Sequence, residues 1–123
     1  MSTSNQTTDE FLKAITAVDE PLVHAVTIRF HDDAAPEAMD KAIATAESLA
    51  TIPGVHNWIV RESLDKRKGR RVLLLGTLDN GQVLAAYRLH PVHVAFVDIL
   101  QHIADWDTVD FVAPPNLLGV PKQ

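Results

Sequence analysis

The stretch Val72-Leu73-Leu74-Leu75-Gly76-Thr77-Leu78 decides the fold, because it is apolar at nearly every position. A strand with one face in water alternates between apolar and polar residues, whereas a continuous apolar strand is covered on both faces. The helices of so small a domain can cover only one face of its sheet. We therefore expect a partner on the other face.

The rest of the chain supplies the other elements of this sheet. Alternation over residues 22–30 predicts a strand whose His24, Val26 and Ile28 face the core. Further strands are predicted over 55–63 and 105–112. Helices are predicted over 9–18 (after a Thr7-to-Glu10 capping box), from Pro36 to the Ile52-Pro53-Gly54 stop, from an Asp79 N-cap to Arg88, and from Pro91 to Ala104.

This order predicts an α+β fold. A β-α-β-β-α-α-β sequence is typical of the ferredoxin-like arrangement, a four-stranded antiparallel sheet with helices on one face. Back-to-back pairing of two such sheets in a symmetric homodimer would cover the open face and give a dimeric α+β barrel. We expect residues 1–20 to form an N-terminal extension with a short helix, 21–113 the domain and 114–123 an irregular tail.

Composition narrows the functional class. The chain has 123 residues, 46% of them hydrophobic, which favours one globular domain. It has no cysteine, which excludes disulfides, thiolate catalysis and iron–sulfur clusters. The first eight residues carry no Lys or Arg, and no apolar run is long enough to span a membrane. We expect a cytoplasmic protein without a membrane partner.

The charge is acidic overall but uneven. A net charge of −5 weighs against nucleic acid as a partner. Six of the eleven basic residues nevertheless lie between Arg61 and Arg71. This segment is interpreted as a solvated hairpin tip, with an anion-contact site as the alternative.

The candidate site lies in Tyr87-Arg88-Leu89-His90-Pro91-Val92-His93-Val94-Ala95-Phe96. If Pro91 starts a helix, His93 lies in its first turn, where the helix dipole disfavours the imidazolium and leaves a neutral base. The break before Pro91 can fold Tyr87 back toward His93, and His24 projects into the same space. These polar groups would suit proton abstraction beside a carbonyl without a metal or cofactor, in an apolar pocket lined by His24, Val26, Ile28 and Phe96.

Structural roles compete with this interpretation. His90 can cap the helix, and His93 and His24 can be hydrogen-bonded core residues. A metal site is the weakest alternative: His90 and His93, and Asp98 and His102, have helical spacing, but no third ligand is evident, so we expect no metal. Tyr87, Trp58 and Trp106 can equally be core residues, and the two tryptophans can be dimer-interface anchors.

Several motifs together resemble a known family. They are His24–Phe30, Ala35-Pro36-Glu37, Ile52–Val55, Tyr87–Phe96 and Asp110-Phe111. In this order they resemble the stress-responsive A/B barrel (Dabb) family over about residues 22–112. The resemblance implies a dimeric α+β barrel, and most members have no assigned reaction.

One plant branch of that family is similar in sequence and is a cofactor-free aldol cyclase of a linear polyketide thioester. The resemblance implies a catalytic role for His93, a helper role for Tyr87 and a pocket role for His24. Val72 and Thr45 stand about where that branch has a His and a Tyr.

Three functions remain open at this point. The first is a homodimer that binds a small apolar or amphipathic ligand near His93 and acts in a stress response. The second is a cofactor-independent cyclase or isomerase that acts on a polyketide-like carbonyl compound, with His93 as general base and Tyr87 as helper. The third is a structural assembly subunit. Whether the protein is an enzyme stays undecided by the sequence.

Overall fold

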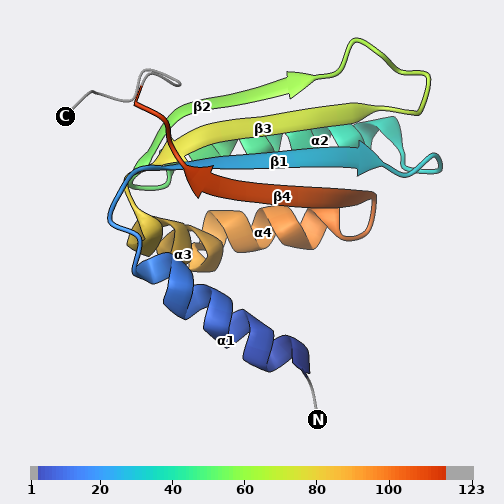
Figure 1. Cartoon of the computed structure of the whole chain (residues 1–123). Helices are drawn as coiled ribbons and strands as arrows, with labels where there is room; N and C mark the ends of the chain where they lie inside the picture. The colour runs from blue at the N-terminus through green and yellow to red at the C-terminus, as the bar shows by residue number, and fades with distance from the viewer. Residues whose placement is uncertain (1–2, 116–123) are drawn as a thin grey trace.

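The computed structural model describes residues 3–115, with side chains from Glu10 onward. The elements follow one another in the expected α+β order (Figure 1). They are α1 (Thr3–Thr16), β1 (Leu22–Phe30), α2 (Pro36–Ser48), a short 3-10 turn η1 (Leu49–Thr51), β2 (Val55–Glu62), β3 (Arg71–Leu78), α3 (Gly81–Leu89), α4 (Pro91–Leu100) and β4 (Ala104–Val112).

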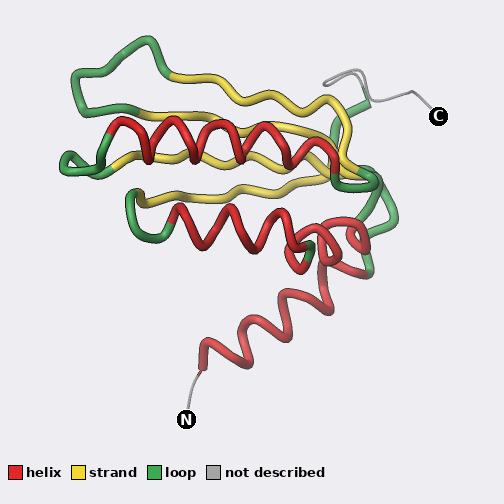
Figure 2. The backbone as a smooth tube through the Cα atoms, turned by 180° about the vertical axis from the view of Figure 1, so that it is seen from behind, coloured by secondary structure: helices red, strands yellow, loops and turns green. Residues whose placement is uncertain are grey.

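The four strands form one antiparallel sheet in the order β2-β3-β1-β4. The helices α2, α3 and α4 lie against one face of it, as the front and back views show (Figures 1 and 2). This is the ferredoxin-like arrangement, so the predicted fold class is confirmed. The hydrophobic core fills the space between sheet and helices.

Local sequence explains where the helices begin. Pro36 occupies the first turn of α2, where its missing N–H costs nothing. The Asn80 side chain caps α3 by accepting a hydrogen bond from Val83 N. The predicted break between α3 and α4 is confirmed, since His90 Nδ1 accepts a bond from Val92 N at 3.1 Å and caps α4.

Three predicted boundaries are wrong. The first helix begins at Thr3 and not at the Thr7 capping box, so residues 3–8 are helical. Asn80 caps α3 in place of Asp79, whose carboxylate instead contacts His56 Nε2 at 2.7 Å. The last helix stops at Leu100, because residues 101–103 form a turn and Ala104 pairs with Phe30 at the start of β4.

The helix α1 lies outside the sheet-and-helix sandwich and packs on α3 (Figure 1). Gly81 N donates to Val18 O at 2.8 Å, and a Cβ at Gly81 would lie 1.5 Å from Ile15 O. Only glycine therefore permits this approach. Arg88 also lies over the Phe11 ring, 5.2 Å from its centroid.

The strand β2 is irregular near its start. Its pairing with β3 shifts between His56 and Ile59, and Asn57 has a positive φ of 54°. Both features mark a β-bulge. The bulge turns Trp58 toward the helices, where its side chain packs against the core.

Within residues 3–115, no single helix is both long enough and apolar enough to cross a membrane. The helices α3 and α4 together meet both requirements, but they are bent by 62° at the break between them.

Candidate functional site

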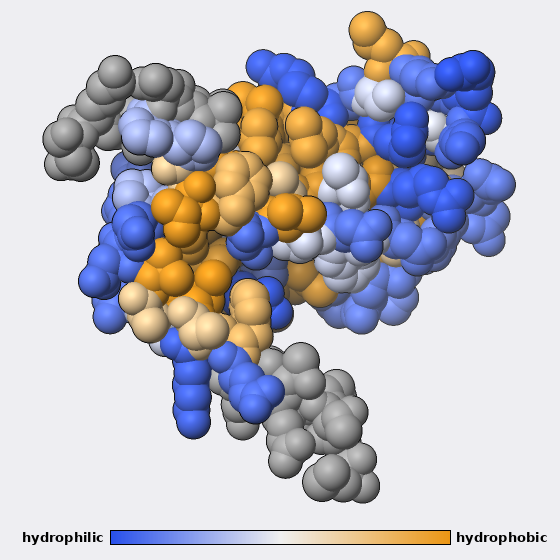
Figure 3. All heavy atoms as spheres, in the orientation of Figure 1, coloured by the Kyte–Doolittle hydropathy of each residue, from blue (hydrophilic) through white to orange (hydrophobic). Residues whose placement is uncertain are grey.

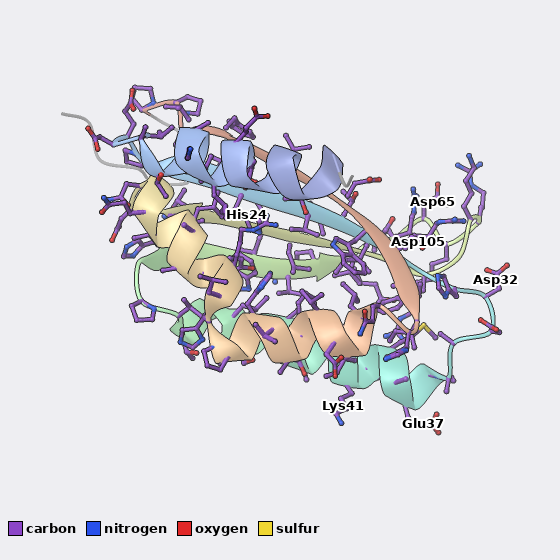
Figure 4. The ribbon with its side chains drawn as sticks, turned by 90° about the horizontal axis from the view of Figure 1, so that it is seen from below. His24, Asp32, Glu37, Lys41, Asp65 and Asp105 are labelled. Carbon is purple, nitrogen blue, oxygen red and sulfur yellow. The ribbon has the colours of Figure 1, made fainter. Side chains whose placement is uncertain are left out.

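His24 lies in the centre of the sheet and is paired with an acidic residue. It is opposite Asp110 in the β1–β4 register, so both side chains project from the same face, toward the helices. His24 Nδ1 lies 2.5 Å from Asp110 Oδ1, and the side chains are only 5% and 9% exposed. Figure 4 places His24 between the sheet and α3. The carboxylate contact fixes the orientation of the imidazole ring.

Tyr87 and His93 come from the two sides of the helix break. The break folds α4 back, so the Tyr87 and His93 ring centroids lie 4.6 Å apart. Tyr87 also meets His24 edge-on at 5.0 Å between centroids. Tyr87 is 1% exposed, whereas His93 is only partly buried. The three predicted polar side chains therefore gather in one cluster, with His93 nearest the surface.

The hydrogen bonding of His93 fixes its tautomer. Its Nδ1 lies 3.0 Å from the Arg88 carbonyl oxygen. A carbonyl oxygen can only accept, so Nδ1 carries the proton and Nε2 keeps its lone pair. This arrangement is the one that a general base needs.

The surroundings set the protonation of this cluster. Burial is the largest cause that lowers the pKa of His93, with small contributions from His24 and Arg88, while the hydrogen bond to the Arg88 carbonyl opposes them. Burial also raises the pKa of Tyr87, and the Asp110 charge adds to that shift. Near neutral pH His93 is thus a neutral base and Tyr87 a protonated phenol. The neutral His93 was expected from the helix dipole, but burial is its main cause.

Trp58 completes the cluster. Its ring stacks on His24 with centroids 6.3 Å apart, and its Nε1 donates to Ala46 O at 2.9 Å. Gly76, which pairs with His24 across the sheet, makes room for that ring, since a Cβ there would lie 2.5 Å from Trp58 Cε3. Trp58 was expected only as a core or interface anchor.

The expected lining residues Val26, Ile28 and Phe96 are buried in the core. Neither of the two grooves described is lined by the cluster, and Ile28 is the one expected lining residue that borders either of them. One runs along α4 beside Leu89 and Val94, and the other crosses the open sheet face. A small molecule would therefore have to reach the cluster from the partly exposed His93.

The remaining candidates have structural partners. His90 caps α4, as expected, and Nδ1 of His93 is engaged by Arg88 O. Asp98 accepts a bond from Gln101. Across the described part of the chain, no group of three or more His, Asp or Glu side chains is arranged to hold a metal ion.

Sequence reasoning missed the role of Asp110 in this cluster. It noted Asp110 only as part of a motif, although one signal was available. Along β4, Asp110 is a lone carboxylate on the side that also carries Ala104 and Trp106, and that side turns toward the core.

The sequence also matches a described family. The family model for the stress responsive A/B barrel domain, Dabb, matches residues 22–113. The chain belongs to the Dabb family. The family assignment made from the motifs is therefore confirmed, and α1 lies outside the matched range. No curated protein matches the chain.

Solved structures share the Dabb fold of this chain. A dimeric ferredoxin-like protein of unknown function from Thermobifida fusca has a TM-score of 0.68 at 24% identity, covering 76% of this chain and 92% of that one. Hydroxynitrile lyase from Passiflora edulis has a TM-score of 0.67 at 16% identity, covering 80% and 98%. The cofactor-independent oxygenase SnoaB from Streptomyces nogalater has 0.63 at 15%, covering 80% and 97%. Structures of this fold therefore include dimers and enzymes.

Proposed function

We propose that this Dabb protein is a cytoplasmic homodimer that binds a small apolar or amphipathic molecule beside His93. The observation that carries the proposal is the contact of Tyr87 with both His24 and His93 in an otherwise apolar interior. Ligand sites are mostly apolar and contain a few convergent polar groups with shifted pKa values. The homodimer is supported by apolar residues on the open face of the sheet, such as Leu75 and Val109, and by the dimeric protein of the same fold.

Binding can be tested with the fluorescent probe 8-anilinonaphthalene-1-sulfonate, which is apolar at one end and anionic at the other. His93→Phe fills the entry to the cluster and should weaken probe binding at least tenfold. His102→Phe is the matched control, because His102 is exposed in the turn after α4. Equal affinity in the two variants would show that the probe binds elsewhere and that the proposed site is wrong.

Proton transfer is a second candidate function, and the tautomer of His93 favours it. His93 Nε2 would remove a proton from the carbon beside a substrate carbonyl, which leaves an imidazolium and an enolate. The Arg88 carbonyl that accepts Nδ1–H would stabilise the imidazolium, and the Tyr87 hydroxyl would donate to the enolate oxygen. In a cyclase the enolate carbon then attacks a second carbonyl, and in an isomerase it is protonated at another position. Neither outcome consumes a cofactor.

Deuterium exchange tests this step without knowledge of the natural substrate. We expect the protein to catalyse exchange of the protons beside the carbonyl of phenylacetone in D2O, followed by NMR. His93→Ala should reduce the catalysed rate by about 10²–10⁴, the usual contribution of a general base. His102→Ala should leave it unchanged. An unchanged rate in His93→Ala, with normal melting, would remove His93 as the base.

A further inference from the structure

The open face of the sheet carries a row of four residues with opposite charges at its ends. Leu73 of β3 is paired with Arg61 of β2 and with Thr27 of β1, and Thr27 is paired with Asp107 of β4. Successive residues of a strand alternate between faces, so all four project away from the helices. We call Arg61, Leu73, Thr27 and Asp107 the charged row. It is positive at the β2 edge and negative at the β4 edge.

The next row along the strands is apolar throughout. Leu75 is paired with Ile59 on one side and with Ala25 on the other, and Ala25 is paired with Val109. Val109 is 60% exposed. Figure 3 shows hydrophobic residues gathered over the middle and left of the molecule, and hydrophilic residues toward the end where the β2–β3 hairpin lies. The face thus joins an apolar centre to a charged end.

A groove of about 700 Å³ crosses this charged end, and its cations are poorly satisfied within the chain. Arg71 Nε is buried without a hydrogen-bond partner among the described residues. Among the residues that the structure describes, the Arg61 guanidinium donates only to the neighbouring Val60 carbonyl, at 2.9 Å. Arg29 and Asp105 are 3.9 Å apart on the surface. A buried guanidinium atom without an acceptor is costly, so the groove is incomplete as it stands.

Two copies can face each other through their sheets in two symmetric ways. If the two-fold axis runs along the strands, β2 of one copy faces β4 of the other at the same level. Arg61 then faces Asp107 of the second copy, and Ile59 faces its Val109. If the axis instead runs across the strands, along the apolar row, each strand faces the same strand of the other copy. The charged row then faces the row on the other side of the apolar row, which consists of His56, Thr77, Val23 and Phe111. That second arrangement buries Asp107 against Phe111 and pairs no opposite charges.

We infer that the homodimer forms about an axis along the strands, with the charged row as the device that sets its orientation. Each Arg61 binds Asp107 of the second copy, and the symmetry repeats the pair. In the neighbouring row, Arg71 faces Arg29 of the second copy, and the second copy's Asp105 lies one strand further out, beside both guanidinium groups. The inference rests on the proposed homodimer and adds which residues meet in it.

The charge pattern favours a second copy over a free anion as the occupant of this groove. An anion would bind the three arginines, but it would be repelled by Asp105 and Asp107, which line the same groove. A copy of the same face carries both signs in the reversed order. At the ends of the charged row it therefore pairs each cation with a carboxylate, which is how complementary interfaces fix orientation.

Charge reversal at the two ends of the row provides the test. Arg61→Asp places two pairs of carboxylates against each other, and Asp107→Arg places two pairs of guanidinium groups there. Each variant alone should weaken self-association about 100-fold, since like charges in an interface are strongly unfavourable. Lys68→Asp is the matched control, because it makes the same charge change in the exposed hairpin between β2 and β3 and should leave association unchanged.

The decisive sample is a one-to-one mixture of the two weakened variants. In the mixed dimer every Asp at 61 or 107 meets an Arg, so dimers should return to within about tenfold of wild-type affinity. Sedimentation velocity measures the affinity, and native mass spectrometry with one ¹⁵N-labelled variant distinguishes mixed from like dimers. The double variant Arg61→Asp with Asp107→Arg should also recover as a homodimer.

The possible failures are distinguishable. A monomeric wild-type protein at micromolar concentration would refute the homodimer itself. A dimeric wild type whose single variants both dimerise normally would leave the homodimer intact and overturn the charged row. Two weakened variants that do not recover on mixing would show that Arg61 and Asp107 do not meet. Weakening by Arg61→Asp alone would indicate an anion site in the groove, and would likewise overturn the inference.

Discussion

The two faces of the sheet differ in how well they satisfy their own polar groups. On the helix side, His24 is bound by Asp110, Trp58 by the Ala46 carbonyl and His93 by the Arg88 carbonyl. On the open side, Arg71 Nε is buried without an acceptor among the described residues. One face is complete within a single chain and the other is not. The buried Arg71 Nε without an acceptor therefore supports the proposal that a second copy covers the open face.

Two neighbouring leucines on β3 test this difference between the faces, with the largest expected effect. Leu74 faces the helices and is 1% exposed, whereas Leu75 faces outward and is only partly buried. Leu74→Ala should lower the free energy of unfolding by about 2–5 kcal/mol, the usual cost of truncating a core leucine. Leu75→Ala should cost about 1 kcal/mol or less in the monomer and should mainly weaken the dimer.

Urea denaturation at low protein concentration, together with sedimentation at higher concentration, separates the two effects. Equal losses of monomer stability in the two variants would mean that both faces are packed within one chain.

Two of the three histidine–aspartate pairs among the described residues test the same difference at the level of single polar contacts. The His24–Asp110 pair is buried, whereas the side chains of His56 and Asp79 are 57% and 53% exposed. Asp110→Ala leaves a buried imidazole N–H without its acceptor and should cost about 1–3 kcal/mol of unfolding free energy. Asp79→Ala should cost less than about 1 kcal/mol, because the water around it already screens the pair.

Thermal and urea unfolding measure both values. If Asp79→Ala proves the more costly, the exposed pair has a structural role that its geometry does not suggest, and the argument from burial fails.

The pH dependence of stability gives the smallest expected effect. Folding lowers the pKa of His93 below its ordinary value of 6.5. As the pH falls through 6.5, the unfolded chain takes up a proton that the folded chain resists, so the free energy of unfolding decreases. The decrease ends once the folded imidazole is also protonated, and above 6.5 this contribution is constant.

His93→Gln removes the contribution. The difference in unfolding free energy between wild type and variant should change by up to about 1.4 kcal/mol per pH unit just below pH 6.5, and should be flat above it. Urea unfolding between pH 5 and 8 measures this difference. The other histidines are present in both proteins, so their contributions to the free energy of unfolding cancel. A wild-type-minus-variant difference that falls as the pH rises would mean that His93 is stabilised in its charged form.

Local patterns predicted the strands better than the helix ends. The strand over residues 22–30 was predicted at its observed bounds, because alternation marks both its faces. The last helix was predicted four residues too long, since Ile103 continues its apolar spacing although it belongs to the turn before β4. Asp79 and Asn80 are both residue types that favour N-caps, so the local sequence does not choose between them. The Asp79 carboxylate is instead bound by His56, which belongs to another strand, β2.

The cluster itself was only half predictable. Tyr87 and His93 flank a local helix break, so their approach follows from nearby sequence. The Asp110 contact depends on which strand lies beside β1 and on the register between them. The stacking of Trp58 on His24 depends on a bulge in β2. Alternation alone fixes neither strand order nor bulges.

The bulge near Asn57 has one more consequence, which concerns the outer edges of the sheet. The edge strands are β2 and β4, and an edge is a template on which further strands can grow into fibres. In β2 the bulge disturbs that template, and in β4 two exposed aspartates charge it, namely Asp105 and Asp107. Growth by strand addition is thus discouraged at both edges. In the proposed homodimer, association through the open face closes after two copies and gives a finite pair, not a polymer.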